Sequence, residues 1–126
     1  MKLNFSSLIL FVHSVERLKS FYVDILKLEI LEEIPSEWLL LDAGNCSIGL
    51  HKIGEQYAAD INTTPKFENN TKIVFDIDED INSLREILLL QQVTLREIKT
   101  FPNYPYWLCD GEDPEGNVFQ LKRKKE

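Results

Sequence analysis

The hydrophobic positions of this chain change period several times, and each change marks the boundary between two elements. Residues Ser6–Val12 are apolar and rich in β-formers, which predicts a buried strand. After it, Ser14 is suited to cap a helix, and Glu16 places a negative charge in the first turn. A helix of about three turns is expected there, because apolar residues recur at three- and four-residue spacing. The stripe consists of Leu18, Phe21, Tyr22, Ile25 and Leu26.

Three short β-like runs follow this helix and predict a hairpin meander. Turn-forming residues separate them at Pro35-Ser36 and at Ala43-Gly44-Asn45. The polar stretch Gly54–Asn70, which contains Pro65, shows neither period and is interpreted as a linker. The three runs are Leu28–Ile34, Glu37–Asp42 and Cys46–Ile53.

The same order restarts after the linker. Lys72–Ile77 predicts a strand, and Asp78 or Asp80 a helix cap. The turn Asp113–Asn117 precedes the final strand. The second helical stripe consists of Ile81, Leu84, Ile87 and Leu88, and the three further strands are expected at Val93–Ile98, Tyr106–Cys109 and Val118–Lys122.

An internal duplication explains this restart. A shift of 65 residues places Leu10 on Phe75 in the first strands, whereas a shift of 66 places Ser14 on Asp80 at the helix starts. One inserted residue is therefore expected at the strand-to-helix corner of the second half. We predict an α+β fold in which two tandem βαβββ modules form a cupped, mostly antiparallel eight-stranded sheet. The single domain, residues 1–126, comprises module one at about 5–53, a linker at 54–70 and module two at about 71–123.

Composition and charge narrow the classes of function. The net charge of −7 opposes binding to nucleic acid, which needs clustered basic residues, and Lys122–Lys125 is interpreted as a solvated tail. The longest apolar runs are far shorter than the roughly 20 residues of a membrane span, and the N-terminus lacks a signal-peptide core. A cytoplasmic protein without membrane contact is expected. Cys46 and Cys109 lack the spacing of a zinc or redox pair and are interpreted as reduced, packed thiols.

Two segments carry a resemblance to a known family. They are Leu8–Leu28, with Phe21-Tyr22 in its helix, and Asp113–Leu121, which reads DPEGNVFQL. On these segments the chain resembles the vicinal-oxygen-chelate superfamily, which contains glyoxalase I, bleomycin- and fosfomycin-resistance proteins and extradiol dioxygenases. The resemblance spans nearly the whole chain and implies two modules that cup a binding cleft.

Metal-using members of that superfamily hold a divalent ion with His or Glu side chains from the first and last strands of each half. Alignment of the halves puts Ser7 and Lys72 at the first-strand positions. Gly49, or Ile48 in an alternative register, and Gln120 fall at the last-strand positions. None of these is a usual strong ligand for such an ion, so neither a metal nor a cofactor is expected. Their identity argues against the glyoxalase and dioxygenase activities, both of which rely on the ion.

The two histidines do not restore a conventional site. Strand alternation allows His13 and His51 to face the cleft. However, His13 lies at the end of its strand, about 20 Å from Ser7, which argues against a site shared with Gln120. His51 is retained as a ligand-binding candidate.

Aromatic residues supply the remaining candidates, because they bury large areas and bind flat or cationic ligands. Two prolines stiffen the aromatic segment Phe101–Trp107, which is predicted to rim the cleft. Lys72 is expected to pair either with an anionic group or with a carboxylate such as Asp76 or Glu112. The predicted ligand-binding residues are Trp38, His51, Lys72, Tyr104, Tyr106, Trp107 and Gln120.

Three functional hypotheses follow. The favoured one is a metal-free module that sequesters a small organic molecule in the cleft, as a homodimer like the bleomycin-resistance proteins. The net charge weakly favours a cationic ligand. The alternative is a metal-dependent lyase, isomerase or dioxygenase of glyoxalase I type with an atypical ligand set such as His51, Gln120 and an acidic side chain. A third is a protein-interaction domain whose cavity is filled.

Overall fold

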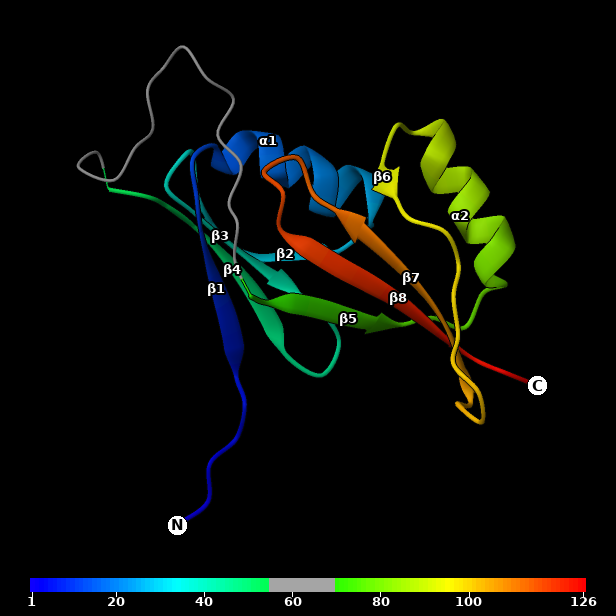
Figure 1. Ribbon diagram of the computed structural model, residues 1–126. Coiled ribbons are helices and arrows are strands. Elements are labelled where there is room, and N and C mark those ends of the chain that lie inside the picture. Colours follow the sequence, from blue (N-terminus) through cyan, green and yellow to red (C-terminus); the bar gives the residue numbers. More distant parts are fainter. Residues whose placement is uncertain (55–69) are drawn as a thin grey trace. The chain divides into compact units, whose positions relative to one another are not determined.

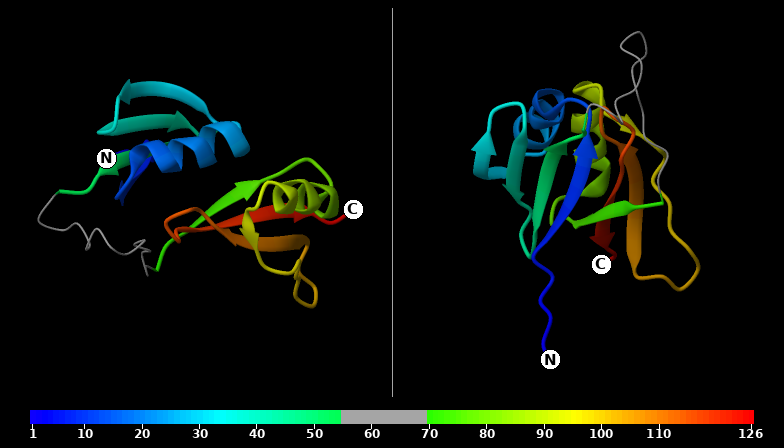
Figure 2. Two further views of the ribbon diagram at one scale, coloured as in Figure 1. Left: turned by 90° about the horizontal axis from the view of Figure 1, so that it is seen from above. Right: turned by 90° about the vertical axis from the view of Figure 1, so that its left-hand side faces the viewer.

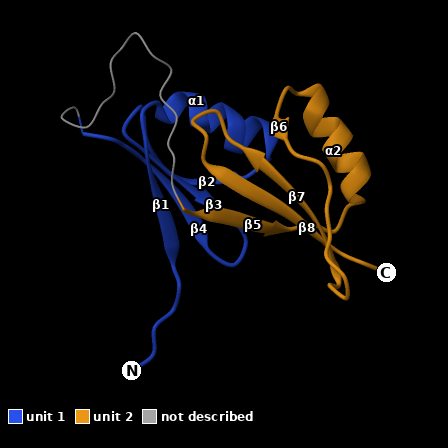
Figure 3. Cartoon of the chain, in the orientation of Figure 1, with its two compact units in different colours: residues 1–65 blue, residues 66–126 orange. Residues whose placement is uncertain are grey.

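The same run of elements occurs twice along the chain (Figure 1). The computed structural model describes residues 1–54 and 70–126. The first run comprises β1 (Ser7–Val12), α1 (Val15–Lys19), η1 (Ser20–Ile25), β2 (Glu29–Ile34), β3 (Trp38–Asp42) and β4 (Ser47–Lys52). The second comprises β5 (Lys72–Asp76), α2 (Ile81–Leu90), β6 (Thr94–Leu95), β7 (Tyr106–Glu112) and β8 (Val118–Lys124). The chain divides into unit 1, Met1–Pro65, and unit 2, Lys66–Glu126 (Figure 3).

Each unit contains one four-stranded sheet with the same topology. The strand order is β1-β4-β3-β2 in unit 1 and β5-β8-β7-β6 in unit 2. In each sheet the first strand runs parallel to the last one, and the other pairings are antiparallel. The predicted α+β fold with two βαβββ modules and mostly antiparallel strands is confirmed. The eight strands of residues 1–54 and 70–126 form two mixed sheets of four.

One face of the unit 1 sheet packs against the helical segment. Alternate residues of a strand point to opposite faces, and the register places Leu10, Leu50 and Leu39 in one row. All three are buried, as are Leu18 of α1 and Tyr22 of η1. Figure 2 shows α1 and η1 along this face. Fully burying a side chain of leucine size contributes roughly 1.5–3 kcal/mol, so this row is a main source of stability.

Unit 2 repeats this packing with different side chains. Phe119 and Leu121 of β8 are buried, as are Ile81 and Leu88 of α2. Cys109 of β7 is also buried, and burial raises the pKa of its thiol. A raised pKa keeps the thiol protonated and poorly nucleophilic, in agreement with a packed role.

Both helices begin at the predicted caps. The Ser14 Oγ accepts a hydrogen bond from the Arg17 backbone N–H at 3.2 Å. In unit 2 the cap is Asp80, whose carboxylate accepts from the Ser83 N–H at 2.9 Å. The predicted insertion of one residue at the second corner is confirmed. One residue lies between Val12 and the Ser14 cap, whereas two lie between Ile77, which is equivalent to Val12, and the Asp80 cap.

A second insertion, which the sequence analysis did not detect, compensates for the first. η1 is a π-helical turn, which holds one more residue than the corresponding α-helical turn. The Leu28 N–H bonds the Tyr22 carbonyl six residues back, whereas the Val93 N–H bonds the Leu88 carbonyl five residues back. The shift between the halves therefore returns from 66 to 65 before β2 and β6 begin.

Three strand predictions in unit 2 were wrong by two or more residues. One of them is β8, which continues to Lys124, two residues beyond the predicted end. The expected strand Val93–Ile98 is reduced to β6, because the ladder to β7 is interrupted between Leu95 and the isolated bridge of Lys99 to Leu108. β7 continues to Glu112, three residues beyond the predicted end.

Most of the predicted linker, residues 55–69, lies outside the described residues. Among the helices of the described ranges, none has both the length and the apolar content needed to cross a membrane.

The Ser14 cap provides a test of the first module. We expect Ser14→Ala to lower the free energy of unfolding by about 1 kcal/mol, because the Arg17 N–H loses its acceptor. Ser20→Ala is the matched control, since the Ser20 hydroxyl only back-bonds to the Glu16 carbonyl at 3.4 Å. Urea denaturation measures both. Equal losses in the two variants would contradict the capping role.

Candidate functional site

The face of the unit 1 sheet opposite the helix carries aromatic and apolar side chains. The register aligns Phe11, His51 and Trp38 across β1, β4 and β3. In the next row, Ile9 pairs with Gly49. Ile9 and Phe11 are 43% and 57% exposed, so these side chains are not buried in the hydrophobic core. We call the surface formed by these five residues the aromatic face.

Trp38 and Gly49 fit each other closely. A Cβ added to Gly49 would lie 2.5 Å from Cη2 of Trp38, which is closer than two carbon atoms can approach. Glycine is therefore the residue that admits the indole ring. The Trp38 Nε1–H donates to Glu32 Oε1 at 3.1 Å and holds the ring in this orientation.

His51 is held between two aromatic rings. Its ring centroid lies 5.5 Å from that of Phe11 and 6.0 Å from that of Trp38. The His51 Nδ1 is 2.8 Å from the Lys52 carbonyl oxygen. Because a carbonyl only accepts, Nδ1 carries the proton of this hydrogen bond, and in the neutral ring Nε2 is an acceptor. The aromatic face thus combines flat apolar surface with one hydrogen-bonding nitrogen.

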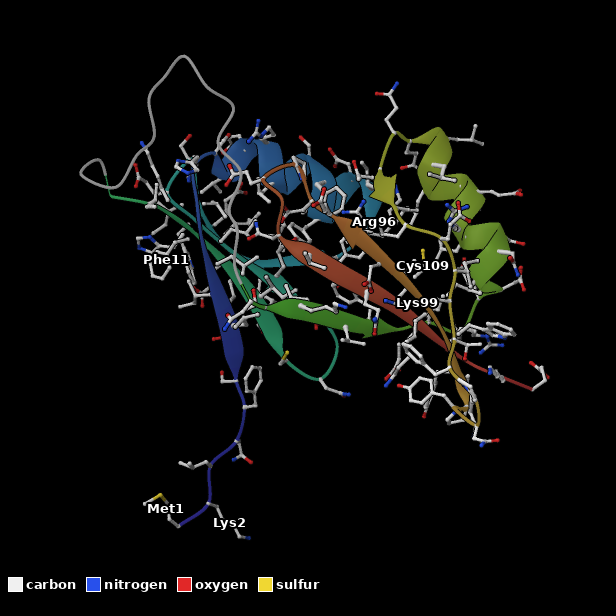
Figure 4. All side chains as sticks on the ribbon, viewed as in Figure 1. Met1, Lys2, Phe11, Arg96, Lys99 and Cys109 are labelled. Carbon is white, nitrogen blue, oxygen red and sulfur yellow. The ribbon has the colours of Figure 1, made fainter. Side chains whose placement is uncertain are left out.

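A hollow of about 390 Å³ adjoins this face, within the usual size range of small-molecule pockets. The Phe11 side chain projects beside β1 at this position (Figure 4). The described residues that line the hollow are Phe11, His51, Lys52, Ile53 and Gly54.

The equivalent face of the unit 2 sheet is polar and centres on Asp110. Its Oδ2 lies 2.9 Å from the Lys72 ammonium and 3.5 Å from that of Lys99, and its Oδ1 accepts from Gln120 Nε2 at 2.8 Å. Gln120 is buried, and the Asp110 side chain is 17% exposed. We call the surface formed by Lys72, Val74, Lys99, Asp110 and Gln120 the polar face. Lys99 extends alongside β7 (Figure 4).

The Asp110 carboxylate stays ionised because its neighbours outweigh its burial. Burial alone would raise the pKa, but the hydrogen bonds from Lys72 and Gln120 and the charges of Lys72 and Lys99 lower it below its ordinary value of 3.8. The expected pairing of Lys72 with a carboxylate is confirmed, but Asp76 and Glu112 were the wrong partners. Asp76 instead lies 3.3 Å from Lys122.

The seven predicted binding residues do not form one group. Trp38 and His51 share the aromatic face, and Lys72 and Gln120 share the polar face through Asp110. Tyr106 precedes Asp110 by four positions on β7, about 13 Å along the strand, and its ring centroid lies 5.5 Å from that of Tyr104.

Trp107 points away from the polar face. Trp107 alternates with Tyr106 on β7 and therefore points to the other face of the strand. The Lys125 ammonium lies 4.7 Å from the centroid of its ring, in a cation–π contact. His13 lies one residue beyond the end of β1, next to the Ser14 cap.

Sequence reasoning missed Phe11, Lys99 and Asp110. Asp110 was missed because the predicted strand ended at Cys109; a longer strand would have placed Asp110 on the same face as Tyr106 by alternation. Lys99 lies beside Asp110 because it forms an isolated β-bridge with Leu108, and no local sequence pattern predicts this bridge.

Comparison with known proteins places this geometry in context. No family model and no curated protein matches the sequence. Among solved structures, lactoylglutathione lyase from Agrobacterium tumefaciens superposes with a TM-score of 0.75 at 17% identity, covering 98% of this chain and 95% of that one. The chain has the vicinal-oxygen-chelate fold.

Two further structures extend this likeness. The antibiotic-binding protein TnmS3 from Streptomyces sp. CB03234 has a TM-score of 0.74 at 19% identity, with 98% of each chain covered. A protein from the mobile metagenome of V. Pseudocholerae has a TM-score of 0.74 at 20% identity, covering 100% of this chain and 98% of that one.

The residues that the resemblance places at metal-ligand positions are not usual ligands of a divalent ion. In unit 1 they are Ser7 and Gly49, and Gly49 lies under the Trp38 ring. In unit 2 they are Lys72 and Gln120, which are already bonded to Asp110. Within residues 1–54 and 70–126, no three His, Cys, Asp or Glu residues are grouped as a metal site requires.

The contact between Gly49 and Trp38 predicts a specific coupling. We expect Gly49→Ala to destabilise the protein by about 1–3 kcal/mol, because the new methyl group displaces the indole ring. In a Trp38→Phe background the shorter ring leaves space, so at least half of this loss should disappear. A double-mutant cycle by urea denaturation measures the coupling. The same loss in both backgrounds would contradict the close fit.

The Asp110 cluster predicts a pH dependence. Because the folded pKa of Asp110 is lowered, its stabilisation is present above the unfolded pKa and is lost as pH falls through the folded pKa. We expect Asp110→Asn to lower the free energy of unfolding by about 1–2 kcal/mol at pH 7, with the difference from wild type shrinking toward pH 3.

The control for this variant is Asp76→Asn, whose carboxylate is 79% exposed and should have little effect at any pH. Urea denaturation at neutral and acidic pH gives both comparisons. An Asp110→Asn loss that is independent of pH would show that the charge of Asp110 is not what stabilises the cluster.

Proposed function

We propose that the protein binds a flat, small organic molecule on the aromatic face of unit 1, without using a metal ion. The observation that carries this proposal is the partly exposed row of Phe11, His51 and Trp38 beside a hollow of about 390 Å³. Small-molecule sites are mostly apolar and contain a few fixed polar groups. His51 Nε2 is such a group here, because its Nδ1 is engaged with the backbone.

The fixed orientation of the rings favours binding over simple surface exposure. The Trp38 indole is held by Gly49 beneath it and by Glu32 at its Nε1. A ligand that stacks on a ring already held in place loses little side-chain entropy on binding. The fold itself accommodates this role, since TnmS3 is described as an antibiotic-binding protein.

The absence of strong ligands at the four metal positions supports a role that needs no ion. Ligand sequestration depends on shape and on a few polar contacts, whereas the chemistry of glyoxalases and dioxygenases depends on a bound ion. The homodimer and the cytoplasmic location expected from the sequence stay predictions.

Fluorescence of Trp38 tests the proposal directly. In a Trp107→Phe background, Trp38 is the only tryptophan. We expect neutral 2-naphthol to quench its emission saturably. Phe11→Ala should weaken this binding about tenfold, because one aromatic contact of about 1.4 kcal/mol is lost.

The matched control is Phe101→Ala, which removes a phenylalanine of similar exposure from unit 2 and should leave the affinity unchanged. Non-saturable quenching, or equal effects of the two alanine variants, would reject the aromatic face as the binding site.

Elemental analysis of protein purified without chelator tests whether the protein works without a metal ion. Stoichiometric zinc, nickel or iron would reject metal-free binding and favour the glyoxalase-type alternative.

A further inference from the structure

The polar face contains more positive than negative charge. Lys72 and Lys99 both direct their ammonium groups at the same oxygen of Asp110. One carboxylate balances one of the two lysines, so the cluster retains one positive charge. This local excess is opposite in sign to the net charge of −7 on the whole chain.

Neighbouring carboxylates do not cancel this excess. Asp76 is paired with Lys122 at 3.3 Å. Glu112 lies on the same face but is separated from Lys72 by two strand spacings, about 10 Å, with Val118 between them. At that separation the attraction between partly solvated charges is strongly reduced by solvent and salt.

The three polar partners of Asp110 differ in how fully they are engaged. Lys72 and Gln120 make short hydrogen bonds, whereas Lys99 is held at 3.5 Å, the outer limit of such a contact. The Lys72 and Lys99 side chains are 40% and 47% exposed, against 17% for Asp110. A solute therefore reaches the two cations more readily than the carboxylate.

Gln120 adds an oriented acceptor. Its Nε2 donates to Asp110 Oδ1, which fixes the direction of the amide. Within the described part of the chain, no hydrogen bond is made to its Oε1. Two ammonium donors and one amide oxygen are thus held around a single fixed carboxylate, next to Val74, which is 48% exposed.

We propose that the polar face binds an anionic oxygen, such as a carboxylate, carried by a small organic ligand. Lys99 supplies the main contact, Lys72 adds a second positive charge, and Asp110 positions both lysines. Val74 offers apolar surface to the carbon skeleton attached to the anion. This inference goes beyond the proposed function, because it assigns a second site, on unit 2, with its own chemical class of ligand. It also replaces the cationic ligand that the net charge of the chain favours.

Binding of benzoate and benzamide to the isotope-labelled full chain tests this assignment by NMR. The two probes have the same shape and differ in charge. We expect benzoate to shift the Gln120 side-chain amide and the Lys99 Nζ signals saturably, with an affinity at least about tenfold above that of benzamide. Added salt should weaken benzoate binding.

Lysine variants separate the charge of the cluster from general surface charge. Lys99→Met should reduce benzoate affinity about tenfold, and Lys99→Arg should retain most of it, because the guanidinium preserves the charge. The matched control is Lys124→Met, which removes the same charge from the end of β8, four residues beyond Gln120, and should leave affinity unchanged.

Each outcome decides the proposal. Loss of binding in Lys99→Met but not in Lys124→Met supports it. It is overturned by equal binding of benzoate and benzamide, by equal effects of the two methionine variants, or by no benzoate shifts at Gln120. Saturable quenching of Trp38 by neutral 2-naphthol is independent of these lysines, so the aromatic site can stand when the anion site fails, and the reverse.

Discussion

Side chains alternate between the two faces of each β-strand, and this alternation determines which residues of this protein are buried. In each unit one set of alternate side chains is buried against a helix, as in the row Leu10, Leu50 and Leu39. These positions tolerate only apolar side chains of suitable size. The other set of alternate side chains forms the aromatic face in unit 1 and the polar face in unit 2. A shift of one residue in register would exchange the two sets, so the buried rows also determine which residues form the aromatic face and the polar face.

The two modules share a topology but have opposite surface chemistry. Where unit 1 has the aromatic row Phe11, His51 and Trp38, unit 2 has Asp76, Lys122 and Leu108 at the equivalent register positions. The next row replaces Ile9, Gly49 and Leu40 with Val74, Gln120 and Asp110. The buried rows beneath the helices are thus apolar in both units, whereas the rows on the opposite face differ, being mainly aromatic and apolar in unit 1 and mainly charged and polar in unit 2.

The metal-ligand positions illustrate how such divergence changes chemistry without changing the fold. A residue that binds a divalent ion must present an unengaged lone pair, as His, Glu or a thiolate does. Lys72 presents a positive charge instead, and Asp110 stabilises it. Gly49 has no side chain, and the ring of Trp38 occupies the adjacent space.

The sequence by itself determined the duplicated βαβββ order, the Ser14 cap, and the choice of Asp78 or Asp80 for the second cap, because each depends on contacts between near neighbours or on a simple period. It also identified Trp38, His51, Lys72 and Gln120 as candidates. The tertiary structure alone decided that Asp110 joins Lys72 to Gln120, that Lys99 reaches the same oxygen, and that the Trp38 ring lies over Gly49. These contacts join residues on different strands, and strand pairing between distant segments leaves no local pattern in the chain.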